Sequence, residues 1–304
     1  MSFMRVNPDP STALLDAINL TQKNINTDLQ EMSTGLDVNS LGDNPAAVAA
    51  LVENHTQTAQ TDQFLQNVNN VQGLLQVGDN AMSSAVNLMT QAISLGVEGA
   101  NGTMSDSDRQ AIAQQMSGIL QQMLGLANLT YQGNYIFAGT ADQTQPFTLN
   151  SASSDGVTYN GNSNVNSVDF GSGQNMAINV PGSQIFTNSN GDIFGALTGM
   201  ISALQSGTGL DAANGALQSA FNELNTQRVF YGNGLTQLES TTTFLNQENV
   251  ELSTQENNLV GANMSQVASD YSAAQVQQQA VLAAASKILD QPTLFDYLDT
   301  TSTT

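Results

Sequence analysis

The chain has no cysteine and no tryptophan, a single histidine, and five Lys and Arg residues against 26 acidic ones, which gives a net charge of -21. The absence of cysteine excludes disulfides, thiol nucleophiles and Cys-based zinc sites. Because phosphate binding depends on clustered Lys and Arg, the charge balance argues against a nucleic-acid groove and against binding to an anionic membrane surface. The acidity itself is typical of a solubilising surface.

Long apolar runs are also missing. No segment approaches the roughly 18 apolar residues of a membrane span, so we expect no membrane insertion. The stretch 1–20 contains Pro8, Asp9, Pro10 and Asp16 and lacks the apolar core of a cleaved signal peptide. If the protein leaves the cell, we expect a route that needs no such peptide.

What the chain has instead is heptad spacing. Aromatic residues make up 6% of the sequence, which argues against a large globular core, whereas apolar residues recur every three or four positions, as in helices that pack along a partner helix. One such seam runs through the last long segment, 260–289, and is interrupted by the polar Gln278. Its apolar positions are Val260, Met264, Val267, Tyr271, Ala274, Val281, Ala285 and Ile288.

A second seam lies at the other end of the sequence. Its members have helical spacing and share one apolar face: Leu14, Ile18, Ile25, Leu29, Met32 and Leu36. Neither stripe can be buried by its own helix, so we expect the first and last helices to pair, with everything between them as a long excursion. The alternative is that both are ordinary amphipathic helices of a globular domain.

Between the two seams, the pattern predicts more long helices and one change of character. Helices are expected over 46–95, from about 105 to 126, over 193–204 and over 212–258. From about 138 to 181, short alternating runs separated by Asn, Ser and Gly predict a β-rich insertion. The strands expected in it are 147–149, 157–159, 168–170 and 176–180.

The predicted fold class is mainly α, with long coiled-coil-like helices from both termini forming an elongated bundle and a small β-rich domain inserted mid-chain. The seam register slips by one residue between Leu259 and Val260, which we interpret as the boundary between an inner bundle and the terminal helices. The predicted domains are a terminal coiled-coil assembly region (1–44 and 259–304), a helical bundle domain (45–137 and 192–258) and the inserted β-rich domain (138–191).

Residues that could carry chemistry give no sign of catalysis. His55 stands among polar neighbours without an adjacent carboxylate, so a surface position is favoured over a ligand role. There is no Gly-rich phosphate loop, catalytic triad arrangement or Glu-x-x-His pair. The Asp and Asn residues of the insertion suggest calcium, but no stretch matches an Asp-x-Asp-x-Asp-Gly loop, which favours turn residues. We expect no enzymatic activity, no cofactor and no metal.

Four groups of residues resemble the bacterial flagellin superfamily and, within it, the hook–filament junction proteins. They comprise an N-terminal signature in three parts, the entry into a β domain, the exit from it, and a C-terminal signature. In chain order they are Met32-Ser33-Thr34-Gly35, Val38-Asn39-Ser40 and Asp43-Asn44-Pro45-Ala46-Ala47; Tyr135-Ile136-Phe137-Ala138-Gly139 with Gln145-Pro146-Phe147; Asn179-Val180-Pro181-Gly182 with Ile185-Phe186; and Leu294-Phe295-Asp296-Tyr297-Leu298.

The sequence also departs from the family pattern in three places. Asn44 replaces the commoner second Asp of an Asp-Asp-Pro run, and Gly42 stands where the family often has Ser. The run 232–235, Gly-Asn-Gly-Leu, replaces a common Gly-Ala-Arg-Leu. These departures concern loops and helix contacts.

The resemblance implies a non-enzymatic structural subunit, exported by the flagellar type III apparatus without a cleaved signal peptide. Outside the cell it would polymerise into a ring-like layer between a hook-associated protein below and flagellin above. The seam residues of both terminal helices would be the subunit-assembly contacts, and free terminal helices would be largely disordered. A cytoplasmic export chaperone would hold the C-terminal segment, here Val267, Tyr271, Val281, Leu282, Ile288 and Leu289.

Two alternatives stay open. One is a minor flagellin that forms filaments itself, against which the C-terminal signature and the small insertion argue. The other is a secreted enzyme or metal-binding adhesin housed in the insertion between Ala138 and Pro181, which tight calcium binding would support.

Overall fold

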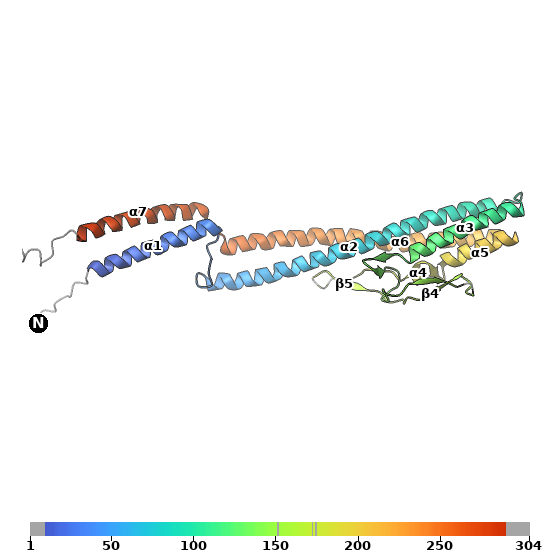
Figure 1. Cartoon of the computed structure of the whole chain (residues 1–304), viewed down its shortest axis with the longest axis horizontal. Coiled ribbons are helices and arrows are strands. Elements are labelled where there is room, and N and C mark those ends of the chain that lie inside the picture. The colour runs from blue at the N-terminus through green and yellow to red at the C-terminus, as the bar shows by residue number, and fades with distance from the viewer. Residues whose placement is uncertain (1–9, 151, 172, 174, 290–304) are drawn as a thin grey trace, which may run out of the picture. The chain divides into compact units, whose positions relative to one another are not determined.

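The computed structural model describes residues 10–289 except 151, 172 and 174. Its helices are α1 (Pro10–Thr34), α2 (Pro45–Gly99), α3 (Asp106–Ala127), α4 (Gly182–Ile185), α5 (Ile193–Ser206), α6 (Leu210–Val260) and α7 (Met264–Leu289) (Figure 1). Two-stranded antiparallel pairs lie between α3 and α5: β1 (Thr130–Tyr131) with β2 (Asn134–Tyr135), β3 (Phe147–Leu149) with β4 (Val157–Tyr159), β5 (Ser167–Asp169) with β6 (Asn175–Ala177), and β7 (Thr187–Asn188) with β8 (Gly191–Asp192). The predicted mainly α fold with a mid-chain β-rich insertion is confirmed.

Two details differ from the sequence prediction. Val260 ends α6 instead of opening the last helix, which begins at Met264. The pairs β1–β2 and β7–β8 were not predicted, because strands of two residues are too short to show an alternating pattern.

The chain divides into two compact units, residues 1–58 with 250–304, and residues 59–249. The division falls inside α2 and α6, which contribute to both units. The three domains expected from the sequence stay a prediction.

In the second unit, α2 and α6 pair in opposite directions. Asn214 donates to the carbonyl oxygen of Gly96 at 3.1 Å, and Arg228 lies 3.0 Å from the Asp79 carboxylate. Since positions rise along one helix as they fall along the other, the helices are antiparallel. Their contact face on α2 keeps heptad spacing, with fully buried side chains at Val68, Leu75, Met82 and Met89.

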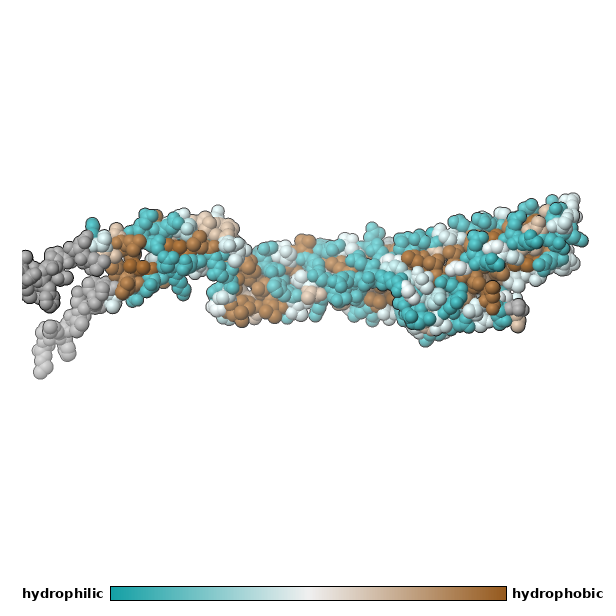
Figure 2. Space-filling model, viewed as in Figure 1, coloured by the Kyte–Doolittle hydropathy of each residue, from teal (hydrophilic) through white to brown (hydrophobic). Residues whose placement is uncertain are grey.

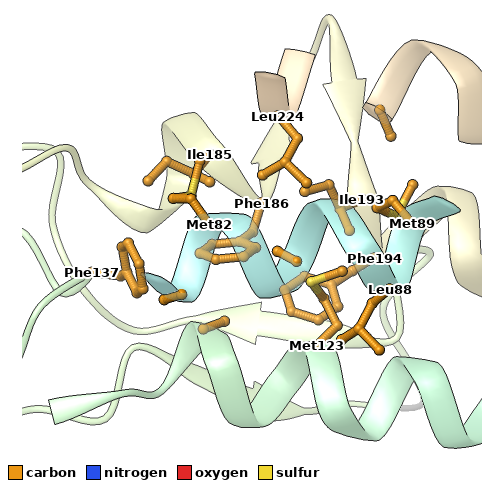
Figure 3. Packing of buried hydrophobic residues seen from close by; sticks show 14 of the residues in the cluster. Met82, Leu88, Met89, Met123, Phe137, Ile185, Phe186, Ile193, Phe194 and Leu224 are labelled. Carbon is orange, nitrogen blue, oxygen red and sulfur yellow. The ribbon is translucent and has the colours of Figure 1, made fainter. Parts of the chain in front are cut away.

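The core of the second unit joins these helices to α3, α5 and the β-rich insertion (Figure 3). Its centre is a group of four buried phenylalanines. The ring of Phe186 lies 5.2 Å from Phe137, 5.6 Å from Phe147 and 5.9 Å from Phe194, measured between ring centroids. Several of these contacts are edge-to-face, the arrangement that aromatic quadrupoles favour. The insertion is therefore anchored to the helices by aromatic packing.

Gly78 of α2 allows the buried ring of Tyr231 to cross the helix. A Cβ at this position would lie 2.3 Å from a ring carbon of Tyr231, so Gly78→Ala overpacks the contact. We expect this variant to lower the free energy of unfolding by about 1–3 kcal/mol despite the better helix propensity of alanine. Gly232→Ala is the control, because a Cβ added there would have no atom of another part of the chain within 4 Å; it should stabilise by up to about 1 kcal/mol. Urea unfolding checks both, and equal effects would contradict the packing argument.

Candidate assembly surface

The first unit brings the two ends of the described chain together. Helices α1 and α7 lie side by side (Figure 1), and Gln278 donates to the Oε1 atom of Gln22 at 2.8 Å. Ile25, Val267 and Ala274 are buried. The pairing of the first and last helices, expected from their seams, is therefore present within one chain.

The residues assigned to the seams take three kinds of position. Buried or half-buried members are Leu14, Ile18, Ile25, Val267, Tyr271 and Val281. Members that stay largely exposed are Leu29, Met32, Leu36 and Met264, between 37% and 44% accessible. Val260 is buried at the end of α6, while the side chains of Ile288 and Leu289 lie outside the described residues, as does the signature 294–298.

The inner face of α1 contains polar residues that the apolar pattern missed. Heptad spacing from Leu14 continues through Thr21, which is 6% exposed, and Asp28, which is half-buried. The Thr21 hydroxyl is satisfied because it donates to the carbonyl oxygen of Ala17 at 2.8 Å. Both positions follow from Leu14 if the alternating steps of four and three residues are continued along α1 through polar as well as apolar residues.

Apolar side chains remain uncovered after α1 and α7 have paired. Leu15 and Leu20 on α1 are 58% and 60% exposed, and Val276 and Leu282 on α7 are 67% and 51% exposed. Figure 2 shows apolar patches among hydrophilic residues over this pair of helices. Together with the exposed seam residues, they form the candidate assembly surface. Exposed apolar side chains on both helices of a pair are candidates for protein–protein contact.

The N-terminal signature folds into the loop between α1 and α2. Gly35 ends α1 with a left-handed φ of 72°, a conformation that glycine adopts without strain. The Asp43 carboxylate accepts bonds from the backbone N–H groups of Asn39 and Ser40, at 3.0 and 2.7 Å. Asn44 then caps α2 by accepting from the N–H of Ala47 at 3.1 Å. The signature residues thus form a turn that is held by hydrogen bonds among themselves.

This loop is bonded to the chain segment that connects α6 and α7. Leu36 and Gly261 form an antiparallel bridge. The N–H of Asp37 donates to the carbonyl oxygen of Val260 at 2.8 Å, and that of Ala262 to Gly35 at 2.9 Å. We call these contacts the terminal clamp. A small apolar cluster of Val38, Ala47 and Val260 packs beside it, so the clamp holds the end of α1 next to the segment that leads into α7.

His55 takes the surface position expected from the sequence, but it has a carboxylate partner that the sequence did not indicate. Its Nε2 lies 3.0 Å from the Glu256 carboxylate, so a carboxylate that is distant in the sequence is its neighbour in space. The adjacent Asn54 is 2% exposed and donates to the carbonyl oxygen of Leu252 at 3.0 Å. Both contacts join α2 to α6 within the first unit, and the exposed His55 pair has no catalytic partners around it in the described residues.

Carboxylates crowd the α1–α7 pair near the clamp. Burial, and then the Asp270 carboxylate, raise the pKa of Asp28 above its usual 3.8. Burial, and then Asp37 and Asp28, raise the pKa of Glu31 above its usual 4.5. A raised folded-state pKa stabilises the pair below the unfolded pKa, and this contribution is lost as pH rises through the folded value. The packing of α1 on α7 should therefore become more stable as the pH falls from neutral.

Asp43, in the loop between α1 and α2, has a pKa that is shifted in the opposite direction. Hydrogen bonds from the Ser40 side chain and then from backbone N–H groups hold the pKa of Asp43 below 3.8. This contribution is present above the unfolded pKa and is lost as pH falls through the lower folded value. Protection of α1 amides should therefore rise from neutral pH toward the usual carboxyl range and fall again below it. Hydrogen exchange, corrected for intrinsic rates, measures the profile.

A pair of aspartate variants separates this effect from general charge. Asp28→Asn removes a half-buried carboxylate and should raise protection at neutral pH and flatten its dependence on pH. Asp16→Asn removes an exposed carboxylate from the same helix and should leave the profile unchanged. The same change in both variants would contradict the assignment to Asp28.

Two further observations concern the described residues. None of their helices is both long and apolar enough to cross a bilayer. Within the same residues, His, Asp and Glu side chains do not gather in groups of three that could hold a metal ion.

The sequence matches two family models. The bacterial flagellin N-terminal helical region matches residues 9–142, and the C-terminal helical region matches residues 215–298. These spans include both halves of the α1–α7 pair and leave out most of the β-rich insertion.

Some relatives are similar to most of this chain, and others to less than half of it. Flagellar hook-associated protein 3 from Salmonella typhimurium is 27% identical over 284 residues, covering 85% of this chain and 87% of that protein. Flagellin B from Helicobacter pylori is 23% identical over 142 residues, covering 46% of this chain and 27% of that protein. The crystal structure of the flagellar junction protein FlgL from Legionella pneumophila has a TM-score of 0.60 at 16% identity, covers 70% of this chain and all of that one, and supports the fold.

These relatives are structural proteins of the flagellum. Like them, this chain is a component of the extracellular bacterial flagellum and not an enzyme. The chain is similar to flagellar hook-associated protein 3 over most of its length, and it belongs to the bacterial flagellin superfamily.

Proposed function

We propose that this protein joins the flagellar hook to the flagellin filament, polymerising through its terminal helices into a ring-like layer. Its neighbours are a hook-associated protein below and flagellin above. The observation that carries the proposal is the candidate assembly surface, because a single chain leaves it uncovered. Burying apolar surface contributes about 25 cal/mol per Å², so a few hundred Å² per subunit stabilise a layer that no free chain can form.

Similarity over most of the chain favours the junction over a minor flagellin. The alignment with hook-associated protein 3 continues through the insertion, whereas that with flagellin B stops within half of the chain. The adhesin alternative would need a ligand site in the insertion that acts without the helices. The aromatic core ties the insertion to α2 and α5 instead.

Export is the second part of the proposal. A cytoplasmic chaperone holds the C-terminal segment before secretion, and export needs no cleaved signal peptide. Leu282 is exposed, while Val267, Tyr271 and Val281 are covered at least in part by the α1–α7 pairing. A chaperone that covers α7 would therefore compete with α1 for the same side chains. Inside the cell, α1 and α7 would then stay apart and the assembly surface would not form.

Deletion of the gene in its own bacterium tests the junction. We expect cells with hooks but without attached filaments, visible by electron microscopy, and restoration by the intact gene. Filaments of normal number and length in the deletion strain would overturn the proposal. Purified chain that alone grows long filaments would favour the minor-flagellin alternative.

A further inference from the structure

A pocket of about 290 Å³ opens on the second unit, between α2 and the β-rich insertion. Its α2 wall carries Asn67 and Asn70 together with the apolar Val71 and Leu74. Asn70 is exposed and Asn67 half-buried, so both amides are accessible from solvent. The volume is near the lower end of small-ligand sites.

The opposite wall is formed by the β1–β2 hairpin. It presents Tyr131 and Tyr135, and Asp142 lies beside them. A Cβ at Gly73 would lie 2.3 Å from the Tyr131 hydroxyl oxygen, so glycine lets this tyrosine lie against α2. Gln132 in the hairpin turn also lines the pocket; its φ of 51° is the one that a two-residue hairpin turn of this kind requires.

The back of the pocket is rigid. Asn179 is 6% exposed, its Nδ2 donates to the carbonyl oxygen of Gly139 at 3.1 Å, and its Oδ1 accepts from the N–H of Asn166 at 2.7 Å. With both ends of this amide bonded, the wall is fixed before any ligand arrives. A preorganised wall lowers the ordering cost of binding.

The lining chemistry selects an uncharged, hydroxylated ligand. Carboxamides offer a donor and an acceptor side by side, which suits neighbouring hydroxyl groups, and a carboxylate accepts from two hydroxyls. Tyrosine rings supply flat apolar faces with a polar end. The lining contains no Lys or Arg, and the chain carries a net charge of -21, so an anionic ligand is disfavoured.

We propose that this pocket binds a neutral saccharide, with Asn70 and Asp142 holding sugar hydroxyls and Tyr131 or Tyr135 packing on the ring. The site lies on the second unit, and its ligand is independent of the junction function. It would give the protein a contact with glycans in addition to its contacts with other subunits.

Saturation-transfer NMR on the full chain tests the proposal with two defined probes, maltotriose and triacetylchitotriose. We expect transfer to the ring protons of at least one probe, with a dissociation constant in the millimolar range. Asp142→Ala should weaken that binding about tenfold, because it removes a charged hydrogen-bond acceptor. 3′-Sialyllactose, which carries a carboxylate, should bind more weakly than the neutral probe.

Matched variants keep the test specific. Asn70→Ala changes an exposed side chain of the pocket and should also weaken binding, whereas Asn87→Ala changes an exposed asparagine of the same helix outside the pocket lining and should not. Circular dichroism confirms that each variant folds. Absence of transfer to both neutral probes at millimolar concentration, or equal binding by Asp142→Ala, overturns the proposal. Weaker self-association of the pocket variants without sugar binding would assign the pocket to a neighbouring subunit instead.

Discussion

Cells that carry Ile25→Asp in place of the natural chain should make hooks without attached filaments and should not swim. Ile25 is 7% exposed in the contact between α1 and α7. An aspartate there would place an unpaired carboxylate in an apolar contact, which costs several kcal/mol or separates the helices. Because the candidate assembly surface consists of both helices held together, their separation should abolish assembly. Swimming assays and electron microscopy of the cell surface measure the outcome.

The adjacent residue provides the control. Asn26 is exposed and its Oδ1 accepts from Gln22 at 3.2 Å, so Asn26→Asp introduces the same charge one position away and keeps the acceptor. This variant should assemble, and Ile25→Leu should as well. Normal swimming by the Ile25→Asp strain would show that the paired helices are not the assembling form. Failure of Asn26→Asp alone would assign the defect to charge on the outer face.

Phe186→Ala should destabilise the second unit by about 3–5 kcal/mol, the range for removing a buried aromatic side chain. Phe186 is 1% exposed, and its ring contacts three other phenylalanines that bring together the insertion and α5 (Figure 3). The cavity would lie where the elements meet, so little relaxation can fill it. Urea unfolding followed by circular dichroism measures the change.

Phe244→Ala is the matched control, because this phenylalanine of α6 is 58% exposed. It should change the free energy of unfolding by no more than about 0.5 kcal/mol. A similar loss in both variants would show that the aromatic group is not the centre of the unit. If Phe244 contacts a neighbouring subunit, Phe244→Ala should weaken assembly more than Phe186→Ala does.

The long helices could be predicted because their heptad pattern extends over many turns. On α2, buried positions recur every seven residues from Val68 to Met89, and no loop or turn chemistry intervenes. The inner positions Thr21 and Asp28 could not be recognised from apolar spacing, since their burial depends on a local hydrogen bond and on the partner helix. The predicted boundary at Val260 was displaced because a seam residue can end one helix and pack on a loop.

The terminal clamp and the pocket lay beyond sequence reasoning for a different reason. The signature around Asp43 was recognised by resemblance, but its bridge to Gly261 joins segments whose contact no local pattern encodes. The pocket collects asparagines from α2 and from three parts of the insertion, each of which reads as an ordinary turn or surface residue. Gly234, one of the departures from the family pattern, also has its contacts in three dimensions: a Cβ there would lie 2.8 Å from the end of the Leu75 side chain and 2.9 Å from the end of Met176.

The terminal clamp has a consequence for the order of folding. Gln22 and Gln278, which meet across the α1–α7 pair, are 256 positions apart, and closing a free loop of that length costs on the order of 5 kcal/mol in chain entropy. Once α2 and α6 have paired, the clamp reduces this search to two short connections, and the terminal helices can zip from it. A chain that has lost either half cannot form the clamp. Only intact subunits would therefore assemble, because a truncated copy never presents the two-helix surface that its neighbours bind.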